Sequence, residues 1–367
     1  MVLVFNAATT GVSGTLSVAI NVSNYIRLHF PLHELYFVTC EPDYVKPFLN
    51  PTIEIIPVSR IPLRYTHRYF FDSFTLPMLV KKLEPDLLVN FDNLPVKTPI
   101  KQLSIVGNPY YAVNCKELRF LKMPEKIIPC FRRWLFYRRL KYVNKFVFQT
   151  DFMAERVMKY ARQKFDYHII PNFHNEKRIS TVPQQLPEKE EGYKYLTYLT
   201  FCYRHKNLDI LPEVARLIKK KRLGIKLWVS FQGKCEKIYD RIVAEGNGDV
   251  VYNLGHIHRE QTAALYAASD GIFFPSILES FSQIMYDAMV RNLPVFISNQ
   301  PYAKTVFGDA VFYFDPYDAE SIVNTIAHIF DRKSISEKTG RYPTLLKTLP
   351  DNDEIALLYV DIIKSML

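Results

Sequence analysis

The stretch from residue 270 to residue 295 constrains the fold more than any other part of the chain. It contains an apolar run at 271–274, a short loop at 275–282, a helical pattern at 283–291 and then a second apolar run. We interpret these segments as a buried strand, a tight loop, a helix with Ser282 as its N-cap, and the next strand. The first turn of a helix presents unpaired backbone N–H groups and the positive end of the helix dipole. The stretch therefore predicts a site for a phosphate or a diphosphate.

Two acidic residues flank this predicted anion site. Glu279 lies in the loop and Asp287 lies in the helix that follows it. An ionised carboxylate accepts stronger hydrogen bonds than a neutral group does, so it suits the hydroxyl groups of a sugar. The two carboxylates therefore predict a ligand that carries hydroxyl groups beside its phosphates.

Strand and helix patterns alternate along most of the chain, which predicts an α/β fold with parallel, helix-covered sheets. In such sheets ligands bind at the carboxyl ends of the strands. A chain of 367 residues is long enough for two domains, each with its own core. We predict a first domain at 1–175, a polar linker at 176–193, a second domain at 194–345 and a terminal segment at 346–367.

Composition indicates a globular protein of a reducing compartment. Charged residues make up 23% and apolar residues 48% of the chain, and no apolar run reaches the length of a membrane span. The cysteines are odd in number and have no CxxC spacing, so we expect neither a disulfide framework nor a zinc site. They are Cys40, Cys115, Cys130, Cys202 and Cys235. We therefore expect a cytoplasmic protein.

The stretch 270–295, called the organising stretch below, resembles the donor-binding signature of the GT-B glycosyltransferases, in particular the retaining family 4 group. The matching residues are Pro275, Ser276, Glu279, Ser280, Phe281, Ser282, Asp287, Ala288 and Met289. Ser280 and Ser282 stand where the family pattern has glycines, and Asp287 stands where it has a glutamate. The resemblance implies the GT-B fold, with two doubly wound Rossmann-like domains that face each other across a cleft. It also implies that the segment 346–367 returns to the first domain.

The same resemblance implies a role for individual residues. Arg204 and Lys206 would bind the diphosphate of the donor, Glu279 would hold hydroxyls of the donor sugar, and Asp287 would hold the ribose. Other donor-binding candidates are Gly11, Gly14, Ile257, Ser280, Phe281, Ser282, Gln283 and Ile284. Two cations beside a departing diphosphate are physically suited to stabilise its charge.

We expect no cofactor and no metal ion, so that the nucleotide-sugar is a co-substrate. The segment from Asp351 to Asp353 has the spacing of a DxD metal motif. It precedes an amphipathic pattern, however, and therefore predicts the start of a helix instead.

The acceptor side of the predicted site rests on two residues at strand ends. Asp92 and Asn108 each follow a predicted strand of the first domain. We expect both of them near the acceptor. For Asp92 the alternative is a structural role as a turn former.

A basic and aromatic segment extends from Lys116 to Lys145. It holds ten Lys and Arg residues against two Glu residues, whereas the formal net charge of the whole chain is +10. Basic heads among aromatic and aliphatic side chains suit the surface of an anionic membrane. A solvated protein face and a nucleic-acid site are the alternatives, and no nucleic-acid-binding motif accompanies the segment.

These features together predict an enzyme that moves a sugar, with retention, from a nucleotide-sugar to a glycan or lipid-linked acceptor. Surface polysaccharide synthesis, lipopolysaccharide included, is the expected setting, with the protein peripheral on the inner face of the membrane. The alternative is a catalytically weak GT-B-like protein that binds a sugar nucleotide or serves as a partner.

Overall fold

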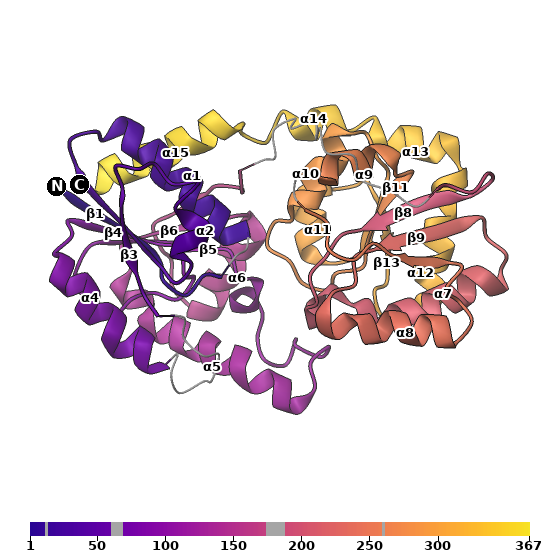
Figure 1. Cartoon of the computed structure of the whole chain (residues 1–367), viewed down its shortest axis with the longest axis horizontal. Helices are drawn as coiled ribbons and strands as arrows, with labels where there is room; N and C mark the ends of the chain where they lie inside the picture. The colour runs from indigo at the N-terminus through magenta and orange to yellow at the C-terminus, as the bar shows by residue number, and fades with distance from the viewer. Residues whose placement is uncertain (12–13, 60–68, 174–187, 259–260) are drawn as a thin grey trace. The chain divides into compact units, whose positions relative to one another are not determined.

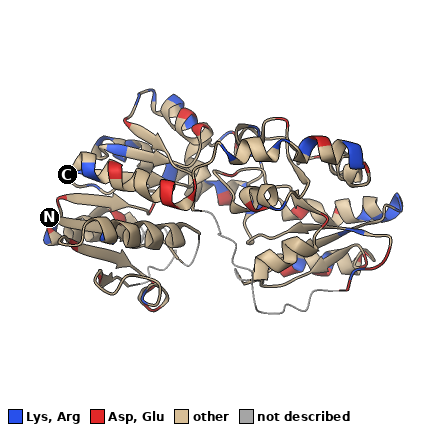
Figure 2. Cartoon of the chain, turned by 90° about the horizontal axis from the view of Figure 1, so that it is seen from above, with Lys and Arg blue, Asp and Glu red and all other residues tan. Residues whose placement is uncertain are grey.

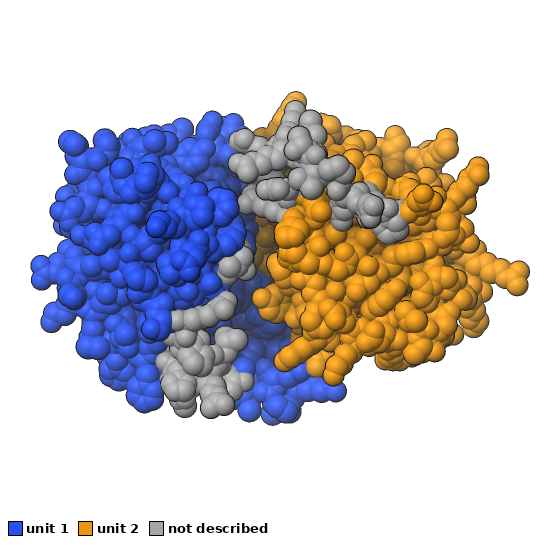
Figure 3. Space-filling view, in the orientation of Figure 1, with its two compact units in different colours: residues 1–173, 350–367 blue, residues 174–349 orange. Residues whose placement is uncertain are grey.

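A computed structural model describes residues 1–11, 14–59, 69–173, 188–258 and 261–367. The chain divides into two compact units, residues 1–173 with 350–367 and residues 174–349 (Figure 3). Most of the linker predicted at 176–193 lies outside the described residues. Each unit is built around its own parallel sheet (Figure 1).

The described part of unit 1 contains a seven-stranded sheet in the order β3-β2-β1-β4-β5-β6-β7, and all neighbouring strands are parallel. The strands are β1 (Val2–Ala7), β2 (Glu34–Thr39), β3 (Glu54–Pro57), β4 (Leu87–Asn90), β5 (Gln102–Val106), β6 (Lys145–Phe148) and β7 (Tyr167–Ile169). The helices are α1 (Gly14–His29), α2 (Pro42–Val45), η1 (Phe71–Thr75), α4 (Leu76–Leu83), η2 (Pro109–Ala112), α5 (Met123–Arg139), η3 (Leu140–Tyr142), α6 (Asp151–Ala161) and α15 (Asn352–Met366).

Alternate residues of β1 pack on opposite faces of this sheet, as the two-residue period of a strand requires. Leu3 and Phe5 belong to a core with α1 and α15, whereas Val4 belongs to a second core with η1 and α4. Both faces are apolar because helices cover both of them, as in doubly wound folds.

The C-terminal helix α15 packs in unit 1 beside α1. Ile355, Tyr359 and Ile363 on its inner face are buried in the same core as α1. Its first turn is closed by Asp351, whose carboxylate accepts from the backbone N–H of Glu354 at 2.8 Å in a capping box. The prediction that the segment from Asp351 to Asp353 starts a helix is therefore confirmed.

The described part of unit 2 contains a six-stranded parallel sheet in the order β10-β9-β8-β11-β12-β13. The strands are β8 (Lys194–Tyr198), β9 (Ile225–Val229), β10 (Val251–Asn253), β11 (Gly271–Phe274), β12 (Val295–Ser298) and β13 (Phe312–Phe314). The helices are η4 (Arg204–Lys206), η5 (Leu208–Ile210), α7 (Leu211–Lys220), η6 (Gly233–Cys235), α8 (Glu236–Ala244), α9 (Thr262–Ala268), α10 (Gln283–Val290), α11 (Pro301–Phe307), α12 (Ala319–Ile326), η8 (Ala327–Phe330), α13 (Arg332–Thr339) and α14 (Tyr342–Leu346).

The strands of both units are largely free of charge, and acidic and basic residues lie mostly on helices and loops (Figure 2). The strand β11 is buried along its whole length, as predicted from its apolar run. It begins with a glycine because the sheet leaves little room there: a Cβ atom on Gly271 would lie 3.0 Å from Leu196 and from the carbonyl of Pro294. The predicted strand, loop and helix of the stretch 270–295 are all present.

Each sheet has one point at which the strand order reverses. In unit 1 the chain lays β2 and β3 on one side of β1 and then continues with β4 on its other side. In unit 2 it lays β9 and β10 on one side of β8 and then continues with β11 on the other side. Loops at the carboxyl ends of strands that flank such a switch point are where doubly wound folds bind ligands.

The cysteines depart from expectation. Among the described residues, Cys115 is disulfide-bonded to Cys130 and Cys202 is disulfide-bonded to Cys235, while Cys40 is in neither bond. The prediction of an absent disulfide framework is therefore wrong for this structure. Spacing could not reveal these bonds, because each joins a loop and a helix, α5 for Cys130 and η6 for Cys235, that meet only after folding.

Within the described parts of the chain, no helix is both long enough and apolar enough to span a bilayer.

Candidate functional site

The candidate site lies at the switch point of unit 2. The loop that follows β8 carries the short helix η4, and the loop that follows β11 leads into α10. These two loops are joined directly, since the backbone N–H of Ile277 donates to the carbonyl of His205 at 2.7 Å. The residues expected to bind the diphosphate and the donor sugar are divided between the two loops.

Lys206 and Glu279 form a nearly buried ion pair across this junction. The Nζ atom of Lys206 lies 2.6 Å from Oε1 of Glu279, and the two side chains are 15% and 11% exposed. The ammonium group also lies 5.6 Å from the centre of the Phe274 ring. The two residues are 73 positions apart in the sequence, and folding brings them into direct contact.

Glu279 is ionised in this setting. Burial alone would raise the pKa of its carboxyl. The charge of Lys206, the charge that His205 takes up in acid, and hydrogen bonds from Lys206 and Ser276 together outweigh burial, so the pKa lies below its usual value. Burial lowers the pKa of His205 to about 4, so its imidazole is neutral at pH 7. The pair therefore holds one positive and one negative charge side by side.

Arg204 lies on the same turn but in a different environment. Its guanidinium makes an ion pair with Asp209 of η5 at 2.9 Å, and both side chains are about half exposed. The structure thus brings Lys206 together with Glu279, while Arg204 is engaged with a neighbouring helix. An exposed pair of this kind is weak, so the guanidinium can exchange Asp209 for a stronger anion.

Helix α10 begins at Gln283, immediately after Ser282, where it was predicted. Ser282 has an extended backbone with φ −98° and ψ 129°, as an N-cap requires, but its side chain makes no capping bond. Ser280 and Phe281 are buried, whereas Ser282, Gln283 and Ile284 are partly exposed. The first turn of α10 is thus the part of this stretch that a ligand can reach.

Asp287 lies on the buried side of α10. It is 4% exposed, and its Oδ1 atom accepts from Arg291 one helical turn later at 3.4 Å. The guanidinium of Arg291 lies 5.8 Å from the centre of the Tyr266 ring. Sequence reasoning missed this partner of Asp287, although the i,i+4 spacing could have indicated it. Binding of a ribose by Asp287 stays a prediction.

The loop after β10 carries the candidate Ile257. This side chain is partly buried and packs against a core cluster formed by Tyr195, Trp228 and Leu265. The side chain of Asn253 fixes the loop by accepting from the backbone N–H groups of Phe231 and Gly255. That Ile257 contacts the nucleotide base stays a prediction.

In unit 1, Asp92 follows the switch-point strand β4 and holds the loop that follows β1. Its carboxylate accepts from the backbone N–H of Thr9 at 3.0 and 3.1 Å and from the hydroxyl of Thr10 at 2.8 Å. The side chain is 4% exposed. These contacts give Asp92 the structural role of a loop anchor. Gly11 is partly exposed in the same loop, and Gly14 is exposed as the first residue of α1.

Asn108 also serves the local backbone. Its side-chain oxygen accepts from the N–H of Tyr110 at 3.0 Å and caps η2. Its own N–H donates to the side chain of Asn93 at 2.7 Å. The acceptor-side roles of Asp92 and Asn108 stay predictions, and both side chains already have structural partners.

Three residues that contact the two loops of the ion pair were not among the predicted site residues. They are Tyr198 at the end of β8, Ser276 at the end of β11 and Tyr302 on α11. The hydroxyl of Tyr198 lies 2.8 Å from the carbonyl of Lys206 and 3.0 Å from the hydroxyl of Ser276. The hydroxyl of Tyr302 donates to the carbonyl of Ser276 at 2.7 Å. In the sequence the two tyrosines have the pattern of core residues.

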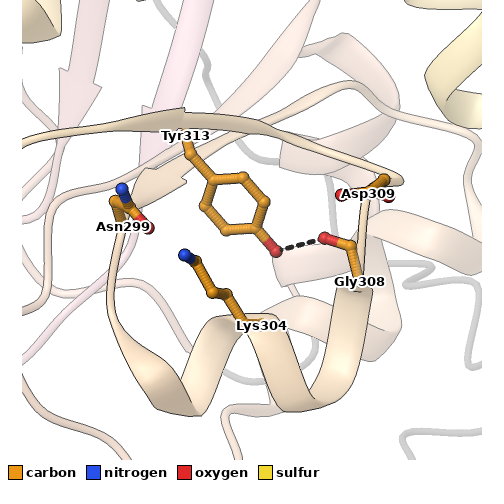
Figure 4. A pocket seen from close by; sticks show the side chains of 5 residues that line it. All are labelled: Asn299, Lys304, Gly308, Asp309 and Tyr313. Carbon is orange, nitrogen blue, oxygen red and sulfur yellow. Dashed lines mark hydrogen bonds between the residues drawn. The ribbon is translucent and has the colours of Figure 1, made fainter.

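A separate surface hollow of about 250 Å³ lies between α11 and β13 (Figure 4). It is lined by Asn299, Lys304, Gly308, Asp309 and Tyr313. The hydroxyl of Tyr313 points at the carbonyl of Gly308 and donates to it at 2.6 Å. None of the predicted site residues lines this hollow.

A metal site was not expected, and no cluster of three or more His, Cys, Asp or Glu residues suited to a metal ion occurs in the described ranges.

Two parallel, doubly wound α/β units, with the organising stretch at the switch point of the second, define the GT-B class of fold. The predicted fold class is confirmed by solved structures. Sucrose-phosphate synthase from Thermosynechococcus elongatus superimposes with a TM-score of 0.75 at 15% identity, covering 100% of this chain and 98% of that one. WaaG, a glycosyltransferase involved in lipopolysaccharide biosynthesis, gives 0.73 at 17% identity over 99% of both chains.

The sequence of unit 2 matches a known family. Residues 181–343 match the model of the family described as glycosyl transferases group 1. O-antigen chain mannosyltransferase B of Escherichia coli is 30% identical over 132 residues, which are 35% of this chain and 34% of the relative. The matched stretch thus spans about a third of that relative. The resemblance to GT-B glycosyltransferases is confirmed.

Proposed function

We propose that this protein is a glycosyltransferase that moves a sugar from a nucleotide-sugar to a glycan or lipid-linked acceptor of surface polysaccharide. The observation that carries the proposal is the ion pair of Lys206 and Glu279 at the switch point of unit 2, beside the first turn of α10. A cation, a carboxylate and the positive end of a helix are the groups that a diphosphate joined to a sugar requires.

The donor would bind by exchange of partners. A phosphate oxygen takes the place of the Glu279 carboxylate at Nζ of Lys206, and Glu279 then accepts from hydroxyls of the donor sugar. Arg204 leaves Asp209 for the second phosphate, and the N–H groups at the start of α10 complete the anion site. As the bond between the sugar and the diphosphate breaks, these donors stabilise the growing charge on the leaving group. The oxygen of an acceptor hydroxyl forms the new bond to the sugar carbon, and the hydroxyl proton passes to the departing diphosphate. We propose that the sugar is transferred with retention and that these protein groups, without a metal ion, carry the stabilisation.

Names of related proteins suggest the donor and the setting. The Escherichia coli relative is an O-antigen chain mannosyltransferase, WaaG acts in lipopolysaccharide biosynthesis, and HepE of Anabaena was solved in complex with UDP and glucose. We therefore propose a UDP- or GDP-hexose as the donor and a cell-surface glycan as the product.

A donor panel tests this proposal. UDP- and GDP-sugars are incubated with lipid-linked or free glycan acceptors, and release of the nucleoside diphosphate is followed together with the anomeric configuration of the product. Wild type should release the nucleoside diphosphate, and Glu279→Gln and Lys206→Ala should each lose at least a hundredfold in rate. Lys304→Ala, an exposed lysine at the hollow of Figure 4, is the matched control and should keep the wild-type rate.

The second candidate is a protein that binds a sugar nucleotide without turning it over. The observation that favours it is the engagement of Asp287 with Arg291 on the buried side of α10. Binding of UDP or GDP by wild type with no release across the whole panel would support this candidate over the enzyme.

We further propose that unit 1 binds an anionic membrane through an apolar surface on two helices. Met123, Ile127, Phe131 and Trp134 form an exposed stripe along α5. A second exposed group lies on η1, α4 and the residue before them, and consists of Phe70, Phe74 and Met78. Tyr69 joins the two groups, because its ring centre lies 5.9 Å from that of Phe131 and 6.0 Å from that of Phe70. Exposed Lys116, Arg119, Lys122 and Arg138 lie in the same segment as the α5 stripe.

The basic segment supplies less free charge than its composition indicates. Arg139 is buried and donates to the carbonyl of Pro95 and to the hydroxyl of Ser73, and Arg133 lies over the rings of Tyr137 and Tyr160. The remaining exposed cations add about 1 kcal/mol each at an anionic surface. Insertion of the exposed stripe of α5 into the membrane would supply the rest of the binding free energy.

Vesicle sedimentation tests the membrane proposal. We expect binding to vesicles that contain phosphatidylglycerol at low salt, weaker binding at high salt, and little binding to phosphatidylcholine alone. Trp134→Ser should weaken binding, whereas Leu32→Ser should not, because Leu32 is 94% exposed on another part of unit 1. Equal binding by both variants would contradict the proposal. The predicted location on the inner face of the membrane is part of the same proposal.

A further inference from the structure

Tyr198 lies at the point where the two loops of the candidate site leave the sheet. It is the last residue of β8 and is fully buried. Its hydroxyl donates to the backbone carbonyl of Lys206 at 2.8 Å and lies 3.0 Å from the hydroxyl of Ser276. One side chain thus contacts both the turn that carries Lys206 and the loop that carries Glu279.

The contact to Ser276 continues to the carboxylate. Ser276 is fully buried, and its hydroxyl donates to the carboxylate of Glu279, so the proton of the Tyr198 hydroxyl is shared between the Lys206 carbonyl and the Ser276 oxygen. Its carbonyl is held from the other side by the hydroxyl of Tyr302 at 2.7 Å. The loop of Glu279 is therefore fixed at Ser276, and Tyr198 fixes the turn of Lys206 relative to that same point.

These hydrogen bonds of Tyr198 matter because a lysine side chain is long and flexible. Its four-carbon stem has many rotamers, so the position of its ammonium group depends on where the backbone places the Cα atom. A displacement of about 1 Å in a catalytic group can cost on the order of a hundredfold in rate. Two hydrogen bonds hold the backbone at Lys206: the Tyr198 hydroxyl donates to the carbonyl of Lys206, and the N–H of Ile277 donates to the carbonyl of His205.

We propose that Tyr198 is a positioning residue of this site: its hydroxyl holds Lys206 and, through Ser276, Glu279 in the geometry that binds a sugar diphosphate. This inference rests on the proposed transferase function. Tyr198 does not itself touch the reacting atoms, and it acts only through the two residues of the ion pair.

The chemistry of the hydroxyl suits this role. Burial keeps the pKa of Tyr198 well above its ordinary value, so the hydroxyl carries its proton throughout the pH range of folded proteins. A protonated hydroxyl can donate to the Lys206 carbonyl at every pH at which the pair is intact. Phenylalanine would fill the same space and lack only this donor.

The test compares two tyrosine-to-phenylalanine variants of unit 2. Tyr198→Phe removes the hydroxyl that contacts the Lys206 carbonyl and Ser276. Tyr342→Phe is the matched control, because Tyr342 is equally buried and its hydroxyl also donates to a backbone carbonyl, that of Leu293 at 3.1 Å, away from the site. Affinity for UDP or GDP, whichever wild type binds, is measured by calorimetry, and kcat and KM are measured with the active donor. We expect Tyr198→Phe to weaken nucleotide binding about fivefold to twentyfold and to lower kcat/KM by at least as much. Tyr342→Phe should stay within twofold of wild type.

A double-mutant cycle separates positioning from general stability. If Tyr198 acts through Lys206, then Tyr198→Phe should cost little further affinity in a Lys206→Ala background. Additive losses, or equal losses in the two phenylalanine variants, would overturn the inference. Should Tyr198→Phe fail to fold, Ser276→Ala is used in its place, and the same non-additivity with Lys206→Ala is expected.

The two proposals fail in different ways. If wild type neither binds nor turns over any nucleotide-sugar, the proposed function is wrong. If wild type is active and the tyrosine variants behave alike, only the role of Tyr198 is wrong.

Discussion

From the ion pair of Lys206 and Glu279 we predict that Glu279→Gln lowers the stability of unit 2. Glutamine keeps the shape of the side chain but removes its charge, so the ammonium of Lys206 is left nearly buried without a counter-charge. At 2.6 Å and an effective dielectric constant of about 20, the two charges attract each other by about 6 kcal/mol before the cost of dehydration. Breaking such a pair typically destabilises a protein by about 3 kcal/mol.

For a unit of residues 174–349, a loss of this size corresponds to about 6–12 °C in the midpoint of thermal unfolding. A bound nucleoside diphosphate should restore much of the stability that Glu279→Gln loses. In the proposed binding mode the diphosphate displaces Glu279 from Lys206 in wild type, whereas in Glu279→Gln the cation is already available. The variant should therefore be less stable than wild type without ligand, yet gain more stability from UDP or GDP than wild type gains.

The assay is thermal and urea-induced unfolding of wild type, Glu279→Gln and Lys206→Ala with and without nucleotide at saturating concentration. Lys206→Ala should gain little from the nucleotide, and Lys304→Ala should respond as wild type does. A smaller gain in Glu279→Gln than in wild type, or a full gain in Lys206→Ala, would refute the reasoning.

Four further predictions concern the stability of the protein and the state of its cysteines. The pKa of His205 is lowered to about 4 in the folded protein, so below its ordinary value of 6.5 the unfolded chain binds protons that the folded chain does not. Stability should fall by up to about 3 kcal/mol as the pH drops from 6.5 to 4, and urea titrations of wild type and His205→Asn should show a shallower pH dependence in the variant. Thiol titration of denatured, unreduced protein should find one thiol per chain, that of Cys40, and five would contradict the disulfides of the structure. Reduction of the bond between Cys202 and Cys235, 33 positions apart, should lower stability by about 3–4 kcal/mol on chain-entropy grounds, which urea unfolding with and without reductant measures. Asp92→Ala should destabilise unit 1 by about 2 kcal/mol, because two donors of the loop after β1, the N–H of Thr9 and the hydroxyl of Thr10, lose their acceptor, and unchanged unfolding would show that these bonds contribute nothing.

The thiol measurement also bears on location. Disulfides persist in oxidising compartments and are rare in the cytoplasm. One thiol per chain in protein isolated under thiol-trapping conditions would argue against the predicted cytoplasmic location, and five would support it.

The parts of the fold that the sequence predicts well are those set by local pattern. The strand at 271–274, the loop and the helix that starts at Gln283 follow from an apolar run, small and polar residues, and a helical period. The start of α15 at Asp351 follows from the amphipathic pattern of the residues after it. In each case the residues that decide the structure are neighbours in the chain.

The parts that the sequence did not predict depend on contacts between distant segments. Lys206 and Glu279 were both named as site residues, but their pairing could not be read from two positions 73 residues apart. Tyr198 has the pattern of an ordinary strand residue, and only the fold shows that its hydroxyl lies under the Lys206 turn. For Asp92, the sequence could not show that its carboxylate turns toward the loop after β1.

The measurement that tests the central claim most directly is a crystal structure of this protein with a bound nucleoside diphosphate. We predict that the diphosphate lies at the first turn of α10, within hydrogen-bond distance of Nζ of Lys206, and that Glu279 has moved out of contact with that atom. A diphosphate bound elsewhere, such as the hollow beside Lys304, with the ion pair of Lys206 and Glu279 still closed at 2.6 Å, would contradict the account.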